Sequence, residues 1–260
     1  GVNSFSLDLV PPIPRARAMD ASASMSTLAG YRAAVLATTS LGRMIPLIMT
    51  SAGTFRPASA LVVGAGAAGL QALATLRRSG AGVTAADIRP AAAEHAASLG
   101  AKVVAVAGET GQGEAACRQE RERLLPHLRR AEIVIAAARL PGKPAPVLIT
   151  QTMVEAMRYG SAIIDLAIIE GGNCTFSRAD ERVVHQGVTI LAPTNVAAQV
   201  PSHASMMLAA NVLAFVAEWV AAEEISPETD DPILRATLVT HAGKVVHPAV
   251  LERLAAGGGS

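Results

Sequence analysis

Short apolar runs alternate with longer helical patterns from about residue 60 onward. The runs begin at Leu61, Val83, Lys102, Glu132, Ser161 and Val188. They are rich in β-branched residues and alanine and have few interior charges, which is typical of strands that are buried on both faces. Alternation of such runs with helices predicts βαβ units. The expected fold class is therefore α/β, with a Rossmann-type doubly wound parallel sheet.

Helical patterns fill the intervals between these runs. The first ends at Gly80 and the second at Gly100, as expected for helices that stop at a glycine. A later helix is expected to start at Pro201, because proline is favourable in a first helical turn, and to run towards Glu223. The residues from 234 onward alternate around Ala242 and predict a C-terminal β-hairpin.

Composition narrows the class of protein. With 260 residues, 51% of them hydrophobic, the chain can bury a sizeable core. Its 22 basic and 21 acidic residues are scattered, so we expect no nucleic acid partner. Cys117 and Cys174 have neither disulfide-framework nor metal-ligand spacing, which favours a reducing, cytoplasmic setting and no metal. Apolar stretches such as residues 133–138 are much shorter than the roughly 20 residues of a membrane span. We therefore expect a soluble segment.

A complete GxGxxG motif follows the first predicted strand. Its glycines are Gly64, Gly66 and Gly69, with Ala67 and Ala68 before the last. In such a motif the first glycine permits a tight turn, the second lets a pyrophosphate approach the backbone, and the third allows close helix packing. A strand, this turn and a helix in succession predict a dinucleotide site, and a ligand-free turn is the less favoured interpretation.

Asp87, at the end of the second predicted strand, completes the motif. It lies 18 positions after Gly69, where an acidic residue can accept hydrogen bonds from the adenosine ribose. Its charge would repel a 2′-phosphate, so the sequence predicts NAD(H) rather than NADP(H) as the cofactor. Arg89 works against this preference, because an arginine nearby can accommodate a 2′-phosphate.

Two further candidates have open interpretations. Gly171, Gly172 and Asn173 follow a predicted strand at the edge of the sheet where ligands bind, but a plain turn explains them about as well. Asn195, just past the last predicted strand, either meets the nicotinamide end of the cofactor or caps a loop.

Long segments throughout the chain match one family. They are PRARAMD from Pro14, LAGYRA from Leu28, MTSAGTFRPASALVVGAGAAGLQALATLRRSGAGVTAADIRP from Met49, LPGKPAPVLIT from Leu140, IIDLAIIEGGNC from Ile163, APTNVAAQVPSHAS from Ala192 and GKVVHPA from Gly243. In these segments the chain resembles the alanine dehydrogenase and pyridine nucleotide transhydrogenase family, on its transhydrogenase branch. Alanine dehydrogenases are less similar around the glycine loop and lack the LPGKPAP segment.

The resemblance implies a function. The chain would be the NAD(H)-binding component, a homodimer, of a proton-translocating, Re/Si-specific NAD(P) transhydrogenase. Hydride would pass between NADH and NADP+ held by a separate NADP(H)-binding subunit or domain, coupled to proton movement through a membrane domain. Its location would be cytoplasmic, peripheral to the inner membrane through these partners. The alternatives are an NAD(H)-binding module with lost or weakened hydride transfer and an oxidoreductase similar to alanine dehydrogenase.

The resemblance also implies site residues. The family's cofactor contacts match Ala67, Ala68 and Gly69 in the loop, Asp87, Ile88 and Arg89 after the second strand, and Arg139, where the family usually has an apolar residue.

A second group of family residues positions the nicotinamide for hydride transfer. The family pattern is similar to Arg-Ile-Ser-Arg-Ala-Gln-x-Met-Asp, and it implies catalytic positions at Arg17 and Asp20. In this chain Pro12 replaces the first arginine, Arg17 replaces the glutamine, and Ala23 replaces a serine that follows the aspartate.

The domain boundaries combine the pattern with the resemblance. Residues 25–197 are expected to form the dinucleotide-binding Rossmann domain. Residues 1–24 and 198–260, with the C-terminal hairpin, are expected to be the remnant of a discontinuous α/β partner domain. The chain would then be truncated at its N-terminus relative to the family, with a shortened form, at residues 108–118, of a loop that closes over the family's site.

Overall fold

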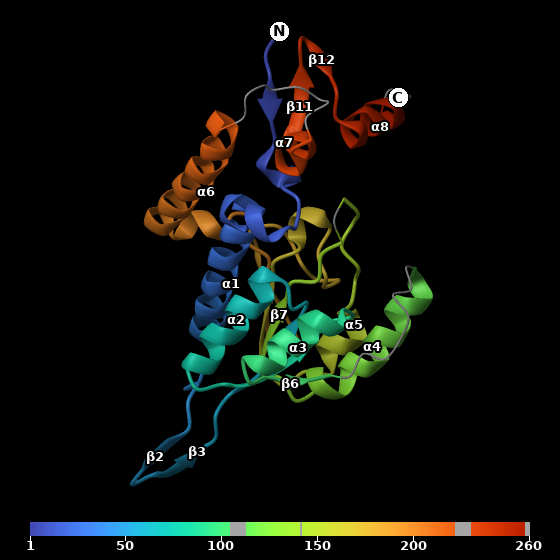
Figure 1. Cartoon of the computed structure of the whole chain (residues 1–260). Helices are drawn as coiled ribbons and strands as arrows, with labels where there is room; N and C mark the ends of the chain where they lie inside the picture. The colour runs from blue at the N-terminus through green and yellow to red at the C-terminus, as the bar shows by residue number, and fades with distance from the viewer. Residues whose placement is uncertain (105–112, 141, 222–229, 258–260) are drawn as a thin grey trace. The chain divides into compact units, whose positions relative to one another are not determined.

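The computed structural model describes residues 1–104, 113–140, 142–221 and 230–257 (Figure 1). The chain divides into two compact units, one of Ser26–Val200 and one of Gly1–Met25 with Pro201–Ser260. Most of the loop expected before Glu114, and the end of the helix expected to reach Glu223, lie outside the described residues.

The larger unit is built on a seven-stranded sheet in the order β6-β5-β4-β7-β8-β10-β9. The strands are β4 (Ser59–Val63), β5 (Gly82–Ala86), β6 (Lys102–Val103), β7 (Ile133–Ala136), β8 (Ala162–Asp165), β9 (Arg182–His185) and β10 (Val188–Leu191). The strands from β6 to β10 in this order are parallel to one another. The order reverses direction between β4 and β7, as in a doubly wound Rossmann sheet. The expected fold class is therefore confirmed.

One strand of the sheet was not predicted. β9 pairs antiparallel with β10 at the edge of the sheet. Its residues alternate between exposed and half-buried, because one face of an edge strand stays in contact with water. The residues 182–185 lack the continuous apolar run that identifies the buried parallel strands.

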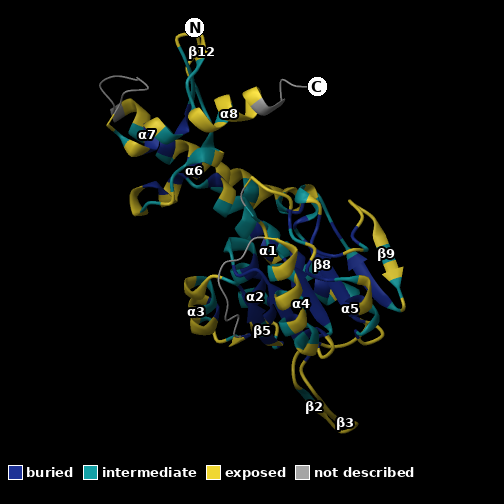
Figure 2. Cartoon of the chain, turned by 90° about the vertical axis from the view of Figure 1, so that its right-hand side faces the viewer, coloured by how far each residue is buried: buried dark blue, intermediate teal, exposed yellow. Residues whose placement is uncertain are grey.

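Helices cover both faces of the sheet. They are α1 (Ala21–Ser40), α2 (Ala67–Arg78), α3 (Pro90–Ser98), α4 (Glu114–Leu128) and α5 (Gln151–Glu155). Successive strand residues point to opposite faces, so Ala60 and Val62 pack with α1, α2 and α3, whereas Leu61 and Val63 pack with α4 and α5. The central strands β4, β7 and β8 are accordingly the most buried part of this unit, whereas the edge strand β9 is partly exposed (Figure 2). Shorter elements are η3 (Ile168–Glu170), η4 (Ala197–Gln199) and an exposed hairpin of β2 (Ile48–Thr50) and β3 (Gly53–Phe55).

The smaller unit joins the two ends of the chain. Its elements are β1 (Ser4–Phe5), η1 (Leu7–Leu9), η2 (Pro14–Met19), α6 (Pro201–Ala221), α7 (Pro232–Thr237), β11 (Leu238–His241), β12 (Lys244–Val245) and α8 (Pro248–Gly257). β11 pairs with β1 and with β12, and Ala242 and Gly243 make the turn of the hairpin with φ of 48° and 81°. Residues 234–237, expected in the hairpin, belong instead to α7, whose first turn is capped by the Asp231 carboxylate.

Helix α6 corrects the expectation that the apolar stretches of this chain are much shorter than a membrane span. Residues 201–220 form a helical stretch of 20 residues with a mean hydropathy of 1.3, long and apolar enough to cross a membrane by length and composition. Ser202, His203 and Asn211 interrupt its apolar residues, so no long uninterrupted run marks it in the sequence. The core of the smaller unit packs Phe215 of this helix with Ala16 and Met19 of η2. One helix of this kind does not by itself indicate a membrane protein.

Candidate functional site

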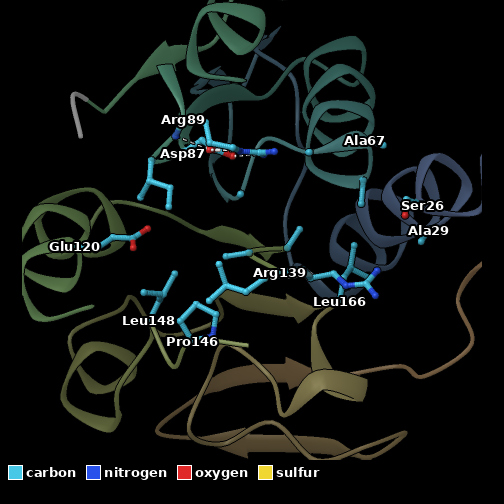
Figure 3. Close-up of a pocket in the computed structure, with 17 residues that line it drawn as sticks. Ser26, Ala29, Ala67, Asp87, Arg89, Glu120, Arg139, Pro146, Leu148 and Leu166 are labelled. Atoms are coloured by element: carbon cyan, nitrogen blue, oxygen red, sulfur yellow. Dashed lines mark hydrogen bonds and ion pairs between the residues drawn. The ribbon is translucent and has the colours of Figure 1, made fainter. Parts of the chain in front are cut away.

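A cavity of about 460 Å³ lies at the carboxyl ends of β4, β5, β7 and β8 (Figure 3). Ligands bind to doubly wound sheets at this edge, where the strand order reverses. The volume is in the range of small-molecule and cofactor sites. Its lining consists of Ser26, Ala29, Gly64, Gly66, Ala67, Ala68, Asp87, Ile88, Arg89, Glu120, Ala137, Ala138, Arg139, Leu140, Pro146, Leu148 and Leu166.

The three glycines of the GxGxxG motif have different surroundings. Gly64 has a φ of 90°, and a Cβ there would lie 2.6 Å from the Ala137 carbonyl oxygen. A Cβ on Gly69 would lie 1.8 Å from the Gly64 carbonyl oxygen, so the helix can approach the strand only without a side chain. A Cβ on Gly66 would have only the Arg89 Nη2 atom nearby, at 3.9 Å. The backbone at Gly66 is therefore accessible to a ligand, whereas the other two glycines are required by the fold.

Helix α2 begins at the wall of the cavity. Gly66 is its N-cap and has extended backbone angles. Glycine offers no side chain to cap the first turn, and Ala67 and Ala68 of that turn line the cavity. The first N–H groups of a helix and its dipole favour an anion at this position. This end of the cavity is suited to a phosphate group.

The Asp87 carboxylate lies beside the glycine loop. Its Oδ2 accepts hydrogen bonds from the Ala65 N–H at 2.7 Å and from Arg89 Nη2 at 2.8 Å. Its Oδ1 accepts from the Arg89 backbone N–H at 2.8 Å and from Arg89 Nε at 2.9 Å. Burial acts to raise the pKa of Asp87, but the Arg89 and Ala65 hydrogen bonds and the Arg89 charge outweigh it and lower that pKa. Asp87 is therefore ionised at neutral pH.

The part of the cavity wall that α4 forms carries a second acid. Glu120 comes from α4 and points into the cavity (Figure 3). Burial, and then the negative charge of Asp87, raise its pKa. Arg139 also lines the cavity and makes an ion pair with Glu170. Glu120 was missed in the sequence because the pattern of α4 is that of a charged, solvated helix.

Gly30 of α1 is another residue that the sequence prediction missed. A Cβ on it would lie 2.0 Å from the Ala68 carbonyl oxygen, so α1 approaches the start of α2 as closely as backbones allow. This approach places Ser26 and Ala29 in the cavity lining. A glycine inside an otherwise helical pattern was the available signal, since it weakens a helix and needs a packing reason.

Asn173 supports the loop that follows β7. It is fully buried, and its Nδ2 donates to the carbonyl oxygens of Ala138 at 2.9 Å and Pro146 at 2.8 Å. Its Oδ1 accepts the Ala138 N–H at 3.0 Å. These bonds hold Ala138 and Pro146 in the cavity wall. Of the two interpretations of the Gly171-Gly172-Asn173 segment, the structure favours the structural one for Asn173.

A buried aspartate in turn holds Asn173. The Asp165 carboxylate is fully buried and accepts the backbone N–H groups of Ala167, Asn173 and Cys174 at 2.9, 2.7 and 3.0 Å. The Ser177 hydroxyl donates to it at 2.6 Å. Burial and the charge of Asp165 raise the pKa of the Cys174 thiol to about 11, so this cysteine stays protonated and unreactive.

Besides the Gly171-Gly172-Asn173 segment, four of the candidate residues lie outside the cavity lining. Gly69 is behind the loop, and Asn195 is exposed. Asp20 and Arg17 belong to the smaller unit. The Asp20 Oδ1 accepts the Ala23 N–H at 2.7 Å and so caps the start of α1, while Arg17 is exposed on η2.

The GxGxxG turn, the acidic residue after the next strand and the cavity at the switch point define the class: a Rossmann-type dinucleotide-binding protein. Residues 33–248 match the family model "Alanine dehydrogenase/PNT, C-terminal domain". An NAD(P) transhydrogenase alpha-subunit polypeptide of Rhodospirillum rubrum is 41% identical over 263 residues, which cover 96% of this chain and 68% of the relative. The chain therefore belongs to the alanine dehydrogenase/PNT family, on the branch of NAD(P) transhydrogenase alpha subunits.

Solved structures agree with this assignment. A transhydrogenase from Sinorhizobium meliloti superimposes with a TM-score of 0.85 at 41% identity, over 95% of this chain and 69% of the other. An L-alanine dehydrogenase has a TM-score of 0.77 at 23% identity over 98% of this chain and 69% of the other, which shows a shared fold. The resemblance drawn from the sequence is confirmed, and so is the cofactor class, a nicotinamide nucleotide.

Proposed function

We propose that this chain is the NAD(H)-binding component of a proton-translocating NAD(P) transhydrogenase and takes part in hydride transfer between NADH and NADP+. The observation that carries the proposal is the cavity in which the ionised Asp87 lies next to an open glycine turn. The family to which the chain belongs supports the reaction type.

The cavity offers a separate group for each part of NAD(H). The N–H groups at the start of α2, at Ala67 and Ala68, would bind the pyrophosphate. Asp87 would accept the adenosine ribose hydroxyls, and its charge disfavours a 2′-phosphate. Apolar Ile88 and Leu148 would contact the adenine. Arg139 lines the cavity beyond the end of β7 and would meet the other half of the cofactor.

Bound NADH supplies the hydride, so the work of this chain is to hold and orient one nicotinamide ring. We infer that the acceptor is NADP+ on a separate NADP(H)-binding subunit or domain, and that a membrane domain couples the exchange to proton movement. The chain would act as a homodimer on the cytoplasmic side of the inner membrane, attached through these partners. Arg17 and Asp20 remain our candidates for positioning the nicotinamide.

A second function is favoured by one observation. Pro12, Arg17 and Ala23 stand where the family pattern has arginine, glutamine and serine. A chain with these replacements could bind NAD(H) while transferring hydride slowly, because a small misplacement of reacting rings can lower the rate on the order of a hundredfold.

Nucleotide titration tests the binding proposal. We expect NADH to bind more tightly than NADPH, and Asp87→Asn to weaken NADH roughly tenfold or more while affecting NADPH less, since a hydrogen bond to a charged group contributes about 1.5–3 kcal/mol. Fluorescence titration of both nucleotides measures this. Asp180→Asn, at an exposed aspartate of the same unit, is the matched control. An NADH affinity that Asp87→Asn leaves unchanged would contradict the ribose role of Asp87.

A transfer assay separates the two functions. The chain is mixed with a cognate NADP(H)-binding domain, and hydride transfer from NADH to an NADP+ analogue is followed. If the loop replacements limit the reaction, Pro12→Arg with Arg17→Gln should raise the rate with little change in NADH affinity. A wild-type rate equal to that of the double variant would remove the support for a binding module.

A further inference from the structure

The Asp87 carboxylate is fully occupied by hydrogen-bond donors. A carboxylate offers about four acceptor positions. Four donors reach it at 2.7–2.9 Å: the backbone N–H groups of Ala65 and Arg89, and the Nε and Nη2 of the Arg89 side chain. No acceptor position is left for a ribose hydroxyl in this arrangement.

Two of the donors to Asp87 are backbone groups and two belong to a side chain, and only the side chain can move away from the carboxylate. The Ala65 and Arg89 N–H groups belong to the backbone of the glycine loop and of the turn after β5, so they move only if the fold changes. The Arg89 side chain is 59% exposed, whereas that of Asp87 is 5% exposed. The guanidinium can therefore rotate into water and free one acceptor position on each oxygen.

The guanidinium also extends over the glycine loop. Its Nη2 is the nearest atom to the position that a Cβ on Gly66 would take, at 3.9 Å. It therefore lies on the approach to the backbone that a dinucleotide would contact. Figure 3 shows it beside Asp87, within the cavity lining.

We propose that Arg89 is a specificity-determining residue that competes with the adenosine ribose for Asp87. This inference rests on the proposed binding of NAD(H). In the free protein the guanidinium occupies the ribose acceptors, so its displacement weakens NADH binding. Once displaced it remains next to the ribose 2′ position, where its charge offsets the repulsion between Asp87 and a 2′-phosphate. Arg89 thus lowers the affinity for NADH and narrows the difference between NADH and NADPH.

Replacement of Arg89 tests the competition. In Arg89→Ala we expect NADH to bind about threefold to tenfold more tightly and NADPH more weakly, so that the ratio of the two dissociation constants rises by about tenfold or more. Titration calorimetry with NADH and with NADPH measures both constants. Arg89→Gln, which keeps a neutral donor, should change the ratio in the same direction by less, and it serves if the alanine variant is unstable. Arg78→Ala removes the same charge from the exposed end of α2 and should leave both constants unchanged.

The outcomes separate this inference from the function on which it rests. NADH binding by the wild type is measured first. Its absence would overturn the proposed function together with the competition between Arg89 and the ribose. If the wild type binds NADH but both Arg89 variants bind it equally or more weakly, the guanidinium is part of the binding site and the competition is wrong. Tighter NADH binding with an unchanged NADPH constant would retain the competition and overturn the role of Arg89 towards the 2′-phosphate.

Discussion

Two aspartates stand at the carboxyl ends of two strands of the same sheet, and one is suited to binding a ligand whereas the other stabilises a loop. Asp87 follows β5 and Asp165 ends β8, and each is buried and accepts four hydrogen bonds. The donors to Asp165 are three backbone N–H groups and a buried hydroxyl, all held by the fold. Two of the donors to Asp87 come from a side chain that can leave. An acid whose donors are all fixed stabilises a loop, and one with a removable donor can bind a ligand.

The largest effect should follow a change at Asp165. Asp165→Asn presents an amide group to donors that need an acceptor, and it leaves buried N–H groups without a partner. We expect the free energy of unfolding to fall by roughly 2–5 kcal/mol, because each lost hydrogen bond to a charged group contributes about 1.5–3 kcal/mol. Urea denaturation followed by circular dichroism measures the loss.

The matched control is Asp180→Asn. Asp180 is exposed and accepts the N–H and the hydroxyl of Thr194 at 2.9 and 2.6 Å. Water can replace these bonds, and asparagine tolerates the left-handed φ of 58° at this position. If Asp165→Asn lowers the free energy of unfolding no more than Asp180→Asn does, the donors to Asp165 do not stabilise the loop. The contrast drawn between Asp165 and Asp87 would then be wrong.

Asp87 can be identified from the sequence more readily than Asp165. The GxGxxG motif has a known spacing to its acidic partner, so Asp87 could be predicted from local chain geometry. The role of Asp165 depends on a return of the chain through Gly171 and Gly172, both with left-handed φ, which brings Asn173 and Ser177 back to the carboxylate. No short motif encodes that return.

The other parts of the site also differ in how far the sequence predicts them. The strands that line it were predicted because their apolar runs are continuous, whereas Glu120 reaches the cavity only through the packing of Leu124 and Leu128 of α4 on the sheet. Asp20 was predicted from the family pattern, and the structure adds its local role as the cap of α1. Its catalytic role remains a prediction.

The glycine loop contains both a residue expected to matter for ligand binding, Gly66, and a residue required by the fold, Gly69. Gly66→Val would place a side chain in the open part of the cavity, so we expect NADH affinity to fall by more than about a hundredfold with little change in stability. Gly69→Ala would drive its Cβ against the Gly64 carbonyl oxygen, so it should instead impair folding. NADH titration together with thermal unfolding separates the two results. Full NADH binding by a folded Gly66→Val protein would remove the loop from the site.

The smallest effect concerns Glu120, a third carboxyl group, which shares the cavity with Asp87 but has its pKa raised rather than lowered. A raised pKa means that the folded state holds the proton more tightly than the unfolded state. The ionised carboxyl therefore reduces stability above its folded pKa, and this reduction disappears below the unfolded pKa.

Glu120→Gln, which is neutral at every pH, should raise the melting temperature by on the order of 1 °C at pH 8 and have no such effect near pH 4. Differential scanning fluorimetry at both pH values measures this. Glu122→Gln, on an exposed position of the same helix, is the matched control. An equal rise for Glu120→Gln at both pH values would show that packing of the amide, rather than loss of a partly buried charge, stabilises the variant. Glu120 would then no longer be an acid held at unfavourable energy in the cavity.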